Sequence, residues 1–178
     1  PTHGSFLLLG EILTTGALDF DLEEKKASCG SCTLCQVECP TGALNNDYEL
    51  DSNRCLAYWT IEQRGPIPFE FWPWLSKYYF GCDICQLVCP FNLEARKNQL
   101  PEKIVPQKMP SLFEVATMDQ KQYERFFGGT PLTRAKRNAL RRNALIAMYQ
   151  LKDPKLAEAL QQVSIDGGFP LEETVEQI

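Results

Sequence analysis

Long apolar runs and export signals are missing from this 178-residue sequence. A helix that crosses a bilayer needs about 20 apolar residues in succession, and no run approaches that length. The opening Pro-Thr-His-Gly has no basic flank before its short apolar run, so a signal peptide is not expected. An initiator methionine is also missing, and we therefore expect the chain to be a segment of a longer protein.

Positive charge is scarce as well. The chain has 18 Lys and Arg against 23 Asp and Glu, a formal net charge of −5. This balance argues against a protein that coats nucleic acid non-specifically, although a local basic patch remains compatible with it. Hydrophobic residues at 44% and charged residues at 23% are close to globular averages, which excludes disorder, collagen and coiled coil as the main state. The length fits one ordinary domain or two small ones.

Eight cysteines are the most informative feature that is present. They are Cys29, Cys32, Cys35, Cys39, Cys55, Cys82, Cys85 and Cys89. The first four follow the C-x2-C-x2-C-x3-C-P spacing of bacterial ferredoxins, in which a tight loop turns the thiolates toward one cluster. A disulfide scaffold would require a short secreted chain, and structural zinc usually takes two separate C-x2-C pairs, so both are less favoured.

The second run, Cys82-Asp-Ile-Cys85-Gln-Leu-Val-Cys89-Pro, lacks a third upstream cysteine, and Cys55 alone is left to complete it. In two-cluster ferredoxins the fourth cysteine of each run binds the other run's cluster. The sequence therefore predicts two 4Fe–4S clusters about a dozen ångströms apart, suited to electron transfer. One takes Cys29, Cys32, Cys35 and Cys89, and the other takes Cys39, Cys55, Cys82 and Cys85.

The N-terminal half is predicted to hold short strands and one helix. Residues 1–15 are expected to form a buried strand, followed by an acidic linker through Lys26. Residues 43–50 are expected to form a hairpin, and Asp51 or Ser52 a cap for a helix of about a dozen residues that Gly65-Pro66 ends. The aromatic run 69–80 is interpreted as a jacket that keeps water off a cluster, or alternatively as the wall of a cofactor or base-stacking pocket.

The C-terminal half is predicted to be helical after a linker at 97–110. Helices are expected after a capping box at Ser111-Leu-Phe-Glu114, after Asp119, from Thr133, after Asp153-Pro154 and from Pro170. The expected buried positions are Leu140, Ala144, Ala147, Met148 and Leu151 in the third helix and Leu156, Ala159, Leu160 and Val163 in the fourth. Short helix pairs of this kind suggest a HEAT-like α-solenoid repeat.

A basic segment without acidic residues spans positions 134–142. It contains Arg134, Lys136, Arg137, Arg141 and Arg142. The neutral interpretation is a solvated helix face; the functional one is a set of salt-sensitive phosphate contacts.

Several motifs together resemble the epoxyqueuosine reductases. They are the opening Gly-Ser-Phe-Leu-Leu-Leu-Gly-Glu-Ile-Leu-Thr, the first cysteine run with its Cys-Pro-Thr-Gly-Ala ending, Arg54-Cys-Leu-Ala-Tyr-Trp-Thr-Ile-Glu62 with Gly65-Pro-Ile-Pro68, Phe80-Gly-Cys-Asp-Ile-Cys-Gln-Leu-Val-Cys-Pro90, Thr130-Pro-Leu-Thr-Arg134 and Arg141-Arg-Asn-Ala144. The resemblance implies reduction of epoxyqueuosine to queuosine in the tRNA anticodon by a cytoplasmic, monomeric enzyme with cobalamin and two 4Fe–4S clusters. It also implies a flavodoxin or ferredoxin as electron donor, no membrane association, and tRNA contact through Arg134, Arg137, Arg141 and Arg142.

The resemblance also implies a division of the chain and places the catalytic residues elsewhere. Residues 1–26 would end an upstream cobalamin-binding domain and its linker, 27–100 would form a two-cluster ferredoxin-like domain, and 101–178 the helical repeat. The predicted fold class is α+β. The proton donor would lie upstream, and His3, the one histidine, is interpreted as a loop residue.

Three other functions compete with this interpretation. A two-cluster electron carrier would need neither the aromatic run nor the basic segment. A corrinoid reductive dehalogenase shares the cofactors but usually carries an export leader and lacks a helical repeat. A solenoid binding module with structural clusters would not respond to reduction.

Overall fold

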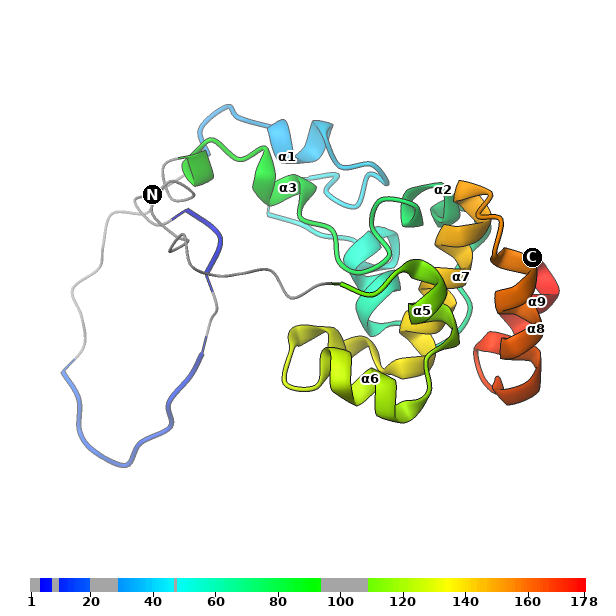
Figure 1. Cartoon of the computed structure of the whole chain (residues 1–178). Coiled ribbons are helices and arrows are strands. Elements are labelled where there is room, and N and C mark those ends of the chain that lie inside the picture. The colour runs from blue at the N-terminus through cyan, green and yellow to red at the C-terminus, as the bar shows by residue number, and fades with distance from the viewer. Residues whose placement is uncertain (1–3, 8–9, 20–28, 47, 94–108) are drawn as a thin grey trace. The chain divides into compact units, whose positions relative to one another are not determined.

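The computed structural model describes residues 4–7, 10–19, 29–46, 48–93 and 109–178 (Figure 1). These residues form helices and loops and no strand. The elements are α1 (Leu34–Val37), η1 (Ser52–Arg54), η2 (Tyr58–Glu62), η3 (Phe69–Phe71), α2 (Trp72–Leu75), α3 (Ile84–Leu87), α5 (Leu112–Thr117), α6 (Gln120–Phe127), η4 (Pro131–Ala135), α7 (Arg137–Leu151), α8 (Leu156–Asp166) and α9 (Leu171–Gln177). The described part is therefore all helical, and the predicted α+β class is not supported.

The strand expected over 1–15 is absent from its described residues, 4–7 and 10–15. Ile12 and Leu13 are 93% and 96% exposed, so these apolar side chains are not buried as a core strand would require. His3, residues 20–28 and most of the expected 97–110 linker lie outside the described residues.

The hairpin and helix expected between the cysteine runs take a different form. The described residues of 43–50 contain no strand; the Asp51 amide donates to the Ala43 carbonyl at 2.9 Å, and Tyr48 has a φ of 63°. Asp51 does cap a helix, because its carboxylate accepts from the Asn53 amide at 3.0 Å. That helix is the short η1, since Cys55 is extended (φ −77°, ψ 123°) and separates it from the π-helix η2.

The chain divides into two compact units whose boundaries differ from the expected domains. One contains the described residues up to 39 and those at 84–93; the other contains those at 40–83 and 109–178. Segment 40–83, which carries Cys55 and Cys82, therefore folds with the C-terminal helices. The reason is its packing on α7, where Ile146 belongs to the same apolar cluster as Leu56 and Trp72.

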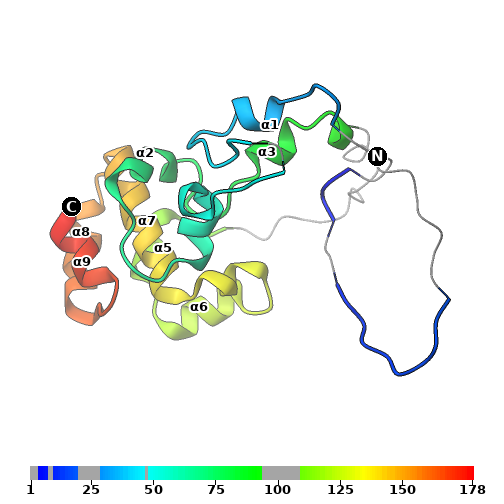
Figure 2. The same cartoon turned by 180° about the vertical axis from the view of Figure 1, so that it is seen from behind.

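Helix α7 is the centre of the second unit, and it contacts α2, α5, α8 and α9 (Figure 2). Every residue from Ala139 to Met148 is buried. Burial at the predicted positions Leu140, Ala144, Ala147 and Met148 is confirmed, but Leu151 is 55% exposed and that prediction is wrong. Because the helix is surrounded on several sides, its burial exceeds the single stripe that helical periodicity predicts.

The ends of the helices agree with the sequence where short-range capping decides them. Ser111 with Glu114 forms the predicted capping box of α5, and Asp119 caps α6 in the same way. The third helix starts later than expected, because Lys136, with φ 65°, separates η4 from α7. In α8, Ala159 and Val163 are buried as predicted.

Candidate iron–sulfur centre

Four of the predicted ligands surround one cavity in the first unit. Its volume is about 160 Å³, and its lining consists of Cys29, Cys32, Cys35 and Cys89 with Leu34, Pro90 and Phe91. These are the four cysteines that the spacing assigns to one cluster, with Cys89 contributed from the second run. Thiolates around an apolar cavity are the donor set that binds a 4Fe–4S cluster, so the residues present fit this group.

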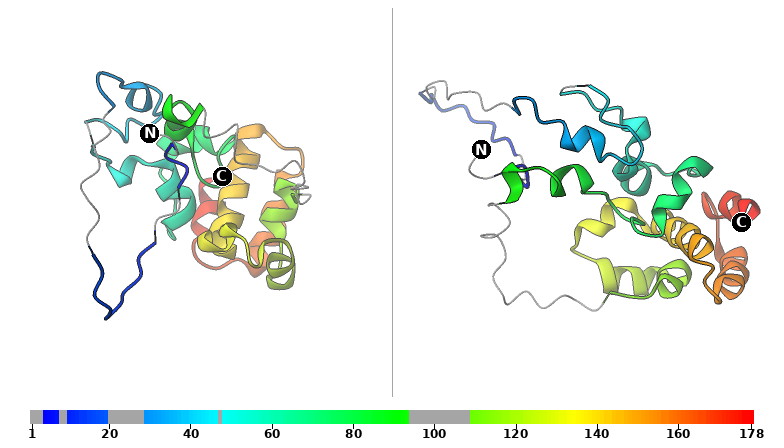
Figure 3. Two further views of the ribbon diagram at one scale, coloured as in Figure 1. Left: turned by 90° about the vertical axis from the view of Figure 1, so that its left-hand side faces the viewer. Right: turned by 90° about the horizontal axis from the view of Figure 1, so that it is seen from above.

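Two short helices position these thiols. Cys35 lies in α1, Cys89 follows α3, and the two helices contact each other, as the blue and green segments of Figure 3 show. The two runs form the same turn. The backbone amide of Cys39 donates to the Gln36 carbonyl at 3.3 Å, and the backbone amide of Cys89 donates to the Gln86 carbonyl at 3.3 Å. The similar sequences that end in Cys-Pro therefore have similar local structure.

Asn92 is a supporting residue that sequence reasoning missed. Its side chain is fully buried, and its Nδ2 donates to the Gln86 carbonyl at 2.6 Å and to Ser5 Oγ at 2.8 Å. Its backbone amide donates to the Cys89 carbonyl at 3.0 Å. Asn92 thus fixes the turn that carries Cys89. An Asn three residues after a cysteine carries no motif of its own, so only the fold reveals this role.

Among the described residues, none of the eight cysteines forms a disulfide. Across residues 4–7, 10–19, 29–46, 48–93 and 109–178, no three His, Cys, Asp or Glu side chains are close enough to hold a single metal ion. Cys29, Cys32, Cys35 and Cys89 lie around a cavity rather than in a tight tetrahedral site.

The second predicted set is distributed differently. Cys39 and Cys85 belong to the first unit, and Cys55 and Cys82 belong to the second. Cys82 is half-buried against the apolar cluster of Leu56, Ile67, Phe71, Trp72, Leu75 and Ile146. Gly81, immediately before Cys82, has a φ of 73°, a conformation that favours glycine. The assignment of these four ligands to one cluster remains a prediction from the sequence.

The aromatic run forms core rather than an open pocket. Phe71 and Trp72 are 4% and 1% exposed, and Trp59 stacks on Phe71 with ring centroids 5.2 Å apart. The Trp72 indole donates to the Ile67 carbonyl at 2.8 Å. Phe69, at 59% exposure, covers Trp72 from outside. Because this core also packs against Cys82, the structure favours the jacket interpretation.

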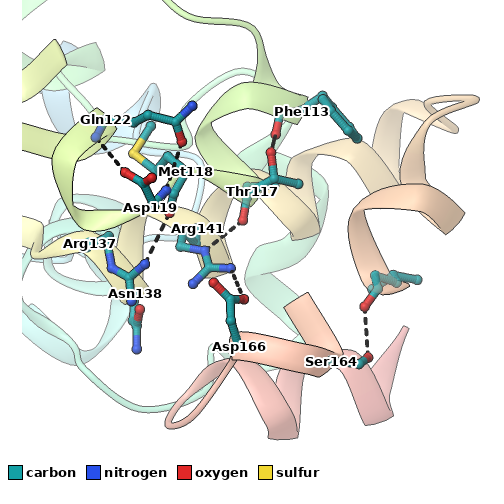
Figure 4. Close-up of polar contacts among 12 residues, drawn as sticks. Phe113, Thr117, Met118, Asp119, Gln122, Arg137, Asn138, Arg141, Ser164 and Asp166 are labelled. Atoms are coloured by element: carbon teal, nitrogen blue, oxygen red, sulfur yellow. Dashed lines mark hydrogen bonds and ion pairs between the residues drawn. The ribbon is translucent and has the colours of Figure 1, made fainter. Parts of the chain in front are cut away.

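The predicted tRNA contacts of Arg141 and Arg142 are wrong, because both side chains are fully buried. Figure 4 shows that Arg141 points to the end of α8, where it donates to Asp166 Oδ1 at 2.7 Å, and also donates to the Ala116 carbonyl at 2.8 Å. Arg142 donates to the carbonyls of Trp59 and Gln63 at 2.9 and 3.0 Å, and to that of Gly65. Both guanidinium groups thus bind protein oxygens instead of facing phosphates.

Two cations of the segment remain on the surface. The Arg134 side chain is 71% exposed and pairs with Glu62, and Lys136 is exposed beside it. Arg137 is half-buried and donates to the Met118 carbonyl at 3.2 Å. The basic segment therefore has an exposed end at 134–136, a half-buried Arg137, and two fully buried arginines.

Burial, and to a smaller extent the nearby charge of Arg64, lower the pKa of Arg142 to about 9. Arg142 still carries its charge at neutral pH, so its carbonyl partners receive charge-assisted hydrogen bonds. These carbonyls lie in and just after the π-helix η2. The last carbonyls of a helix have no intrahelical donor and need a partner from elsewhere. Arg142 consequently functions as a buried cap of η2.

Comparisons with known proteins agree with this site. Residues 28–92 match the 4Fe-4S double cluster binding domain. The chain is 35% identical to the epoxyqueuosine reductase of Pseudomonas aeruginosa, over 95% of this chain and 47% of that protein. It is also 35% identical to the Escherichia coli epoxyqueuosine reductase, over 82% of this chain and 38% of that protein. The chain thus spans about half the length of the relatives it matches, or less.

Solved structures show the same relationship. The epoxyqueuosine reductase of Streptococcus thermophilus superposes with a TM-score of 0.75 at 28% identity, over 89% of this chain and 42% of that one. A crystal structure of epoxyqueuosine reductase with an epoxyqueuosine-modified tRNA-Tyr stem loop gives 0.70 at 28% identity, over 85% and 41%. The fold and the cysteines define a protein with a double-cluster 4Fe–4S domain.

More particularly, the chain is a homologue of the epoxyqueuosine reductases, as its motifs predicted. In the parts of the chain that the structure describes, no helix is long and apolar enough to cross a membrane.

Proposed function

We propose that this chain is the electron-relay portion of an enzyme that reduces epoxyqueuosine to queuosine in tRNA. The observation that carries the proposal is the apolar cavity ringed by Cys29, Cys32, Cys35 and Cys89. Its supporting context is homology to epoxyqueuosine reductases over 82–95% of the chain. Conversion of the epoxide to the alkene consumes two electrons and two protons and releases the oxygen as water.

In this proposal, bound 4Fe–4S clusters supply the one-electron transfers, and cobalamin supplies the chemistry at the epoxide. Cys29, Cys32, Cys35 and Cys89 hold one cluster, and Cys39, Cys55, Cys82 and Cys85 hold the other. Leu34, Pro90 and Phe91 limit the access of water to the first cluster, which tunes its reduction potential. The resemblance implies that cobalamin is bound by an upstream region and not by the residues of this chain.

The exposed end of the basic segment supports a role in tRNA contact. Arg134 and Lys136 are surface cations in a chain of net charge −5, so they provide local attraction for a phosphate backbone. We further propose that the electron donor is a flavodoxin or ferredoxin type of protein. The enzyme is proposed to be a cytoplasmic monomer whose C-terminal helices form a HEAT-like repeat.

Anaerobic turnover tests it. Two proteins are compared: this chain, and the same chain extended at its N-terminus to the length of its relatives. Each is reconstituted with iron, sulfide and cobalamin, reduced, and given tRNA that bears epoxyqueuosine. Mass spectrometry of the nucleosides should show queuosine with the longer protein. Absence of queuosine from both proteins, with both clusters loaded and no cobalamin bound, would instead support a two-cluster electron carrier.

A further inference from the structure

Cys55 stands apart from both cysteine runs, so local spacing cannot determine where its thiol lies. It precedes η2 in an extended conformation, and the Trp59 amide donates to its carbonyl at 3.2 Å. Cys82, which the same predicted cluster requires, follows a glycine turn that begins 26 residues after Cys55. Some tertiary contact must therefore fix the two segments relative to each other.

The hydroxyl of Thr60 provides that contact. Thr60 Oγ1 donates to the Leu56 carbonyl at 2.8 Å and accepts from the Gly81 amide at 3.0 Å. Leu56 directly follows Cys55, and Gly81 directly precedes Cys82. The Thr60 side chain is fully buried, so water does not replace either bond in the folded protein.

The amide of Asn143, on α7, secures the same two segments a second time. Its Nδ2 donates to the Thr60 carbonyl and to the Tyr79 carbonyl, each at 2.8 Å. Its Oδ1 accepts from Arg142 Nε at 3.0 Å and from Arg142 Nη2 at 2.8 Å. Because a guanidinium can only donate, Arg142 fixes which way the buried amide faces.

We propose that Thr60 and Asn143 are positioning residues for the thiolates of Cys55 and Cys82, and hence for the cluster that these cysteines bind. The inference rests on the ligand assignment in the proposed function. Groups that orient metal ligands typically change metal affinity by about 10–100-fold when they are removed. The network is buried and its polar groups are paired, so loss of one member leaves a neighbour unsatisfied.

The test is Thr60→Val in the full chain, reconstituted anaerobically. The substitution keeps the shape of the side chain and removes the acceptor of the Gly81 amide. Thr174→Val is the matched control, since Thr174 is 1% exposed and its hydroxyl donates to the Pro170 carbonyl at 3.0 Å within its own helical turn. Thr60→Ser restores the hydroxyl. Iron content, chelator-induced iron release and the low-temperature EPR spectrum of the reduced protein are measured.

Wild type should hold about eight iron atoms. Thr60→Val should release iron from one cluster at least about tenfold faster and shift only that cluster's EPR signal. Thr174→Val should match wild type, and Thr60→Ser should recover most of the loss. Asn143→Asp, which keeps the contact with Arg142 but cannot donate to the two carbonyls, should affect the same cluster.

Equal behaviour of Thr60→Val and Thr174→Val would overturn the inference, and so would equal damage to both clusters. Failure of wild type to bind two clusters would instead refute the ligand assignment of the proposed function. Loss of cluster signal by Cys55→Ser but not by Thr60→Val would retain that assignment and reject the positioning role.

Discussion

The guanidinium of Arg141 pairs with the carboxylate of Asp166 at 2.7 Å, which joins the first half of α7 to the last residue of α8. The Arg141 side chain is fully buried, whereas that of Asp166 is 47% exposed. A second bond reaches the Ala116 carbonyl in α5. One buried cation thus connects three helices of the second unit.

Asp166→Ala should therefore lower the free energy of unfolding by about 1–3 kcal/mol, because it leaves a buried charge without its carboxylate. Urea denaturation followed by circular dichroism measures the change. Glu62→Ala, which breaks the exposed pair with Arg134, is the control and should cost less than about 1 kcal/mol. A larger loss for Glu62→Ala than for Asp166→Ala would contradict this ranking.

The crossed ligand assignment makes neighbouring cysteines act on different clusters. Cys89→Ser should damage the cluster built on Cys29, Cys32 and Cys35, and Cys39→Ser should damage the other one. EPR of each reduced variant, with iron analysis, should show about half the iron lost in each case but distinct residual signals. Identical residual signals, in variants that remain folded, would refute the crossed arrangement.

Phosphate contact should depend on the exposed end of the basic segment and not on its buried part. Lys136→Ala should weaken tRNA binding and reduce the slope of log K against log salt by about 1. Arg141→Ala should leave that slope unchanged while destabilising the fold, because its side chain is buried. Binding titrations at several salt concentrations distinguish the two, and a flatter slope for Arg141→Ala alone would contradict the expectation.

Alkaline pH should weaken the second unit in part through Tyr79. Burial raises the pKa of Tyr79 above its ordinary value of 10.0, because the phenolate would lose solvation in the folded chain. The unfolded chain then releases this proton at lower pH than the folded one. The stabilising contribution is complete below pH 10 and is lost as pH rises through the folded pKa.

Tyr79→Phe removes that titration. The difference in unfolding free energy between wild type and Tyr79→Phe should be constant below pH 10 and should shift against wild type above it. Urea midpoints measured at intervals across this range check the shift. A difference that stays constant throughout would show that Tyr79 does not titrate with unfolding.

Features that depend on short-range spacing could be predicted from the amino-acid sequence. The ring of Cys29, Cys32 and Cys35 follows from a loop of seven residues, and the capping boxes at Ser111 and Asp119 each involve residues three apart. Helical periodicity likewise predicted the burial of Leu140, Ala144 and Met148. In these cases the partners are close along the chain, so local geometry brings them together.

The roles of the polar residues of α7 depend on contacts between residues that are far apart along the chain. Arg142 binds the carbonyls of Gln63 and Trp59, which precede it by 79 and 83 residues, and Asn143 binds the carbonyl of Thr60 across 83. A sequence pattern assigns arginines to the surface because an isolated buried charge is costly. Here the carbonyls near the end of η2 offset that cost, and they become available only when segment 40–83 folds onto α7.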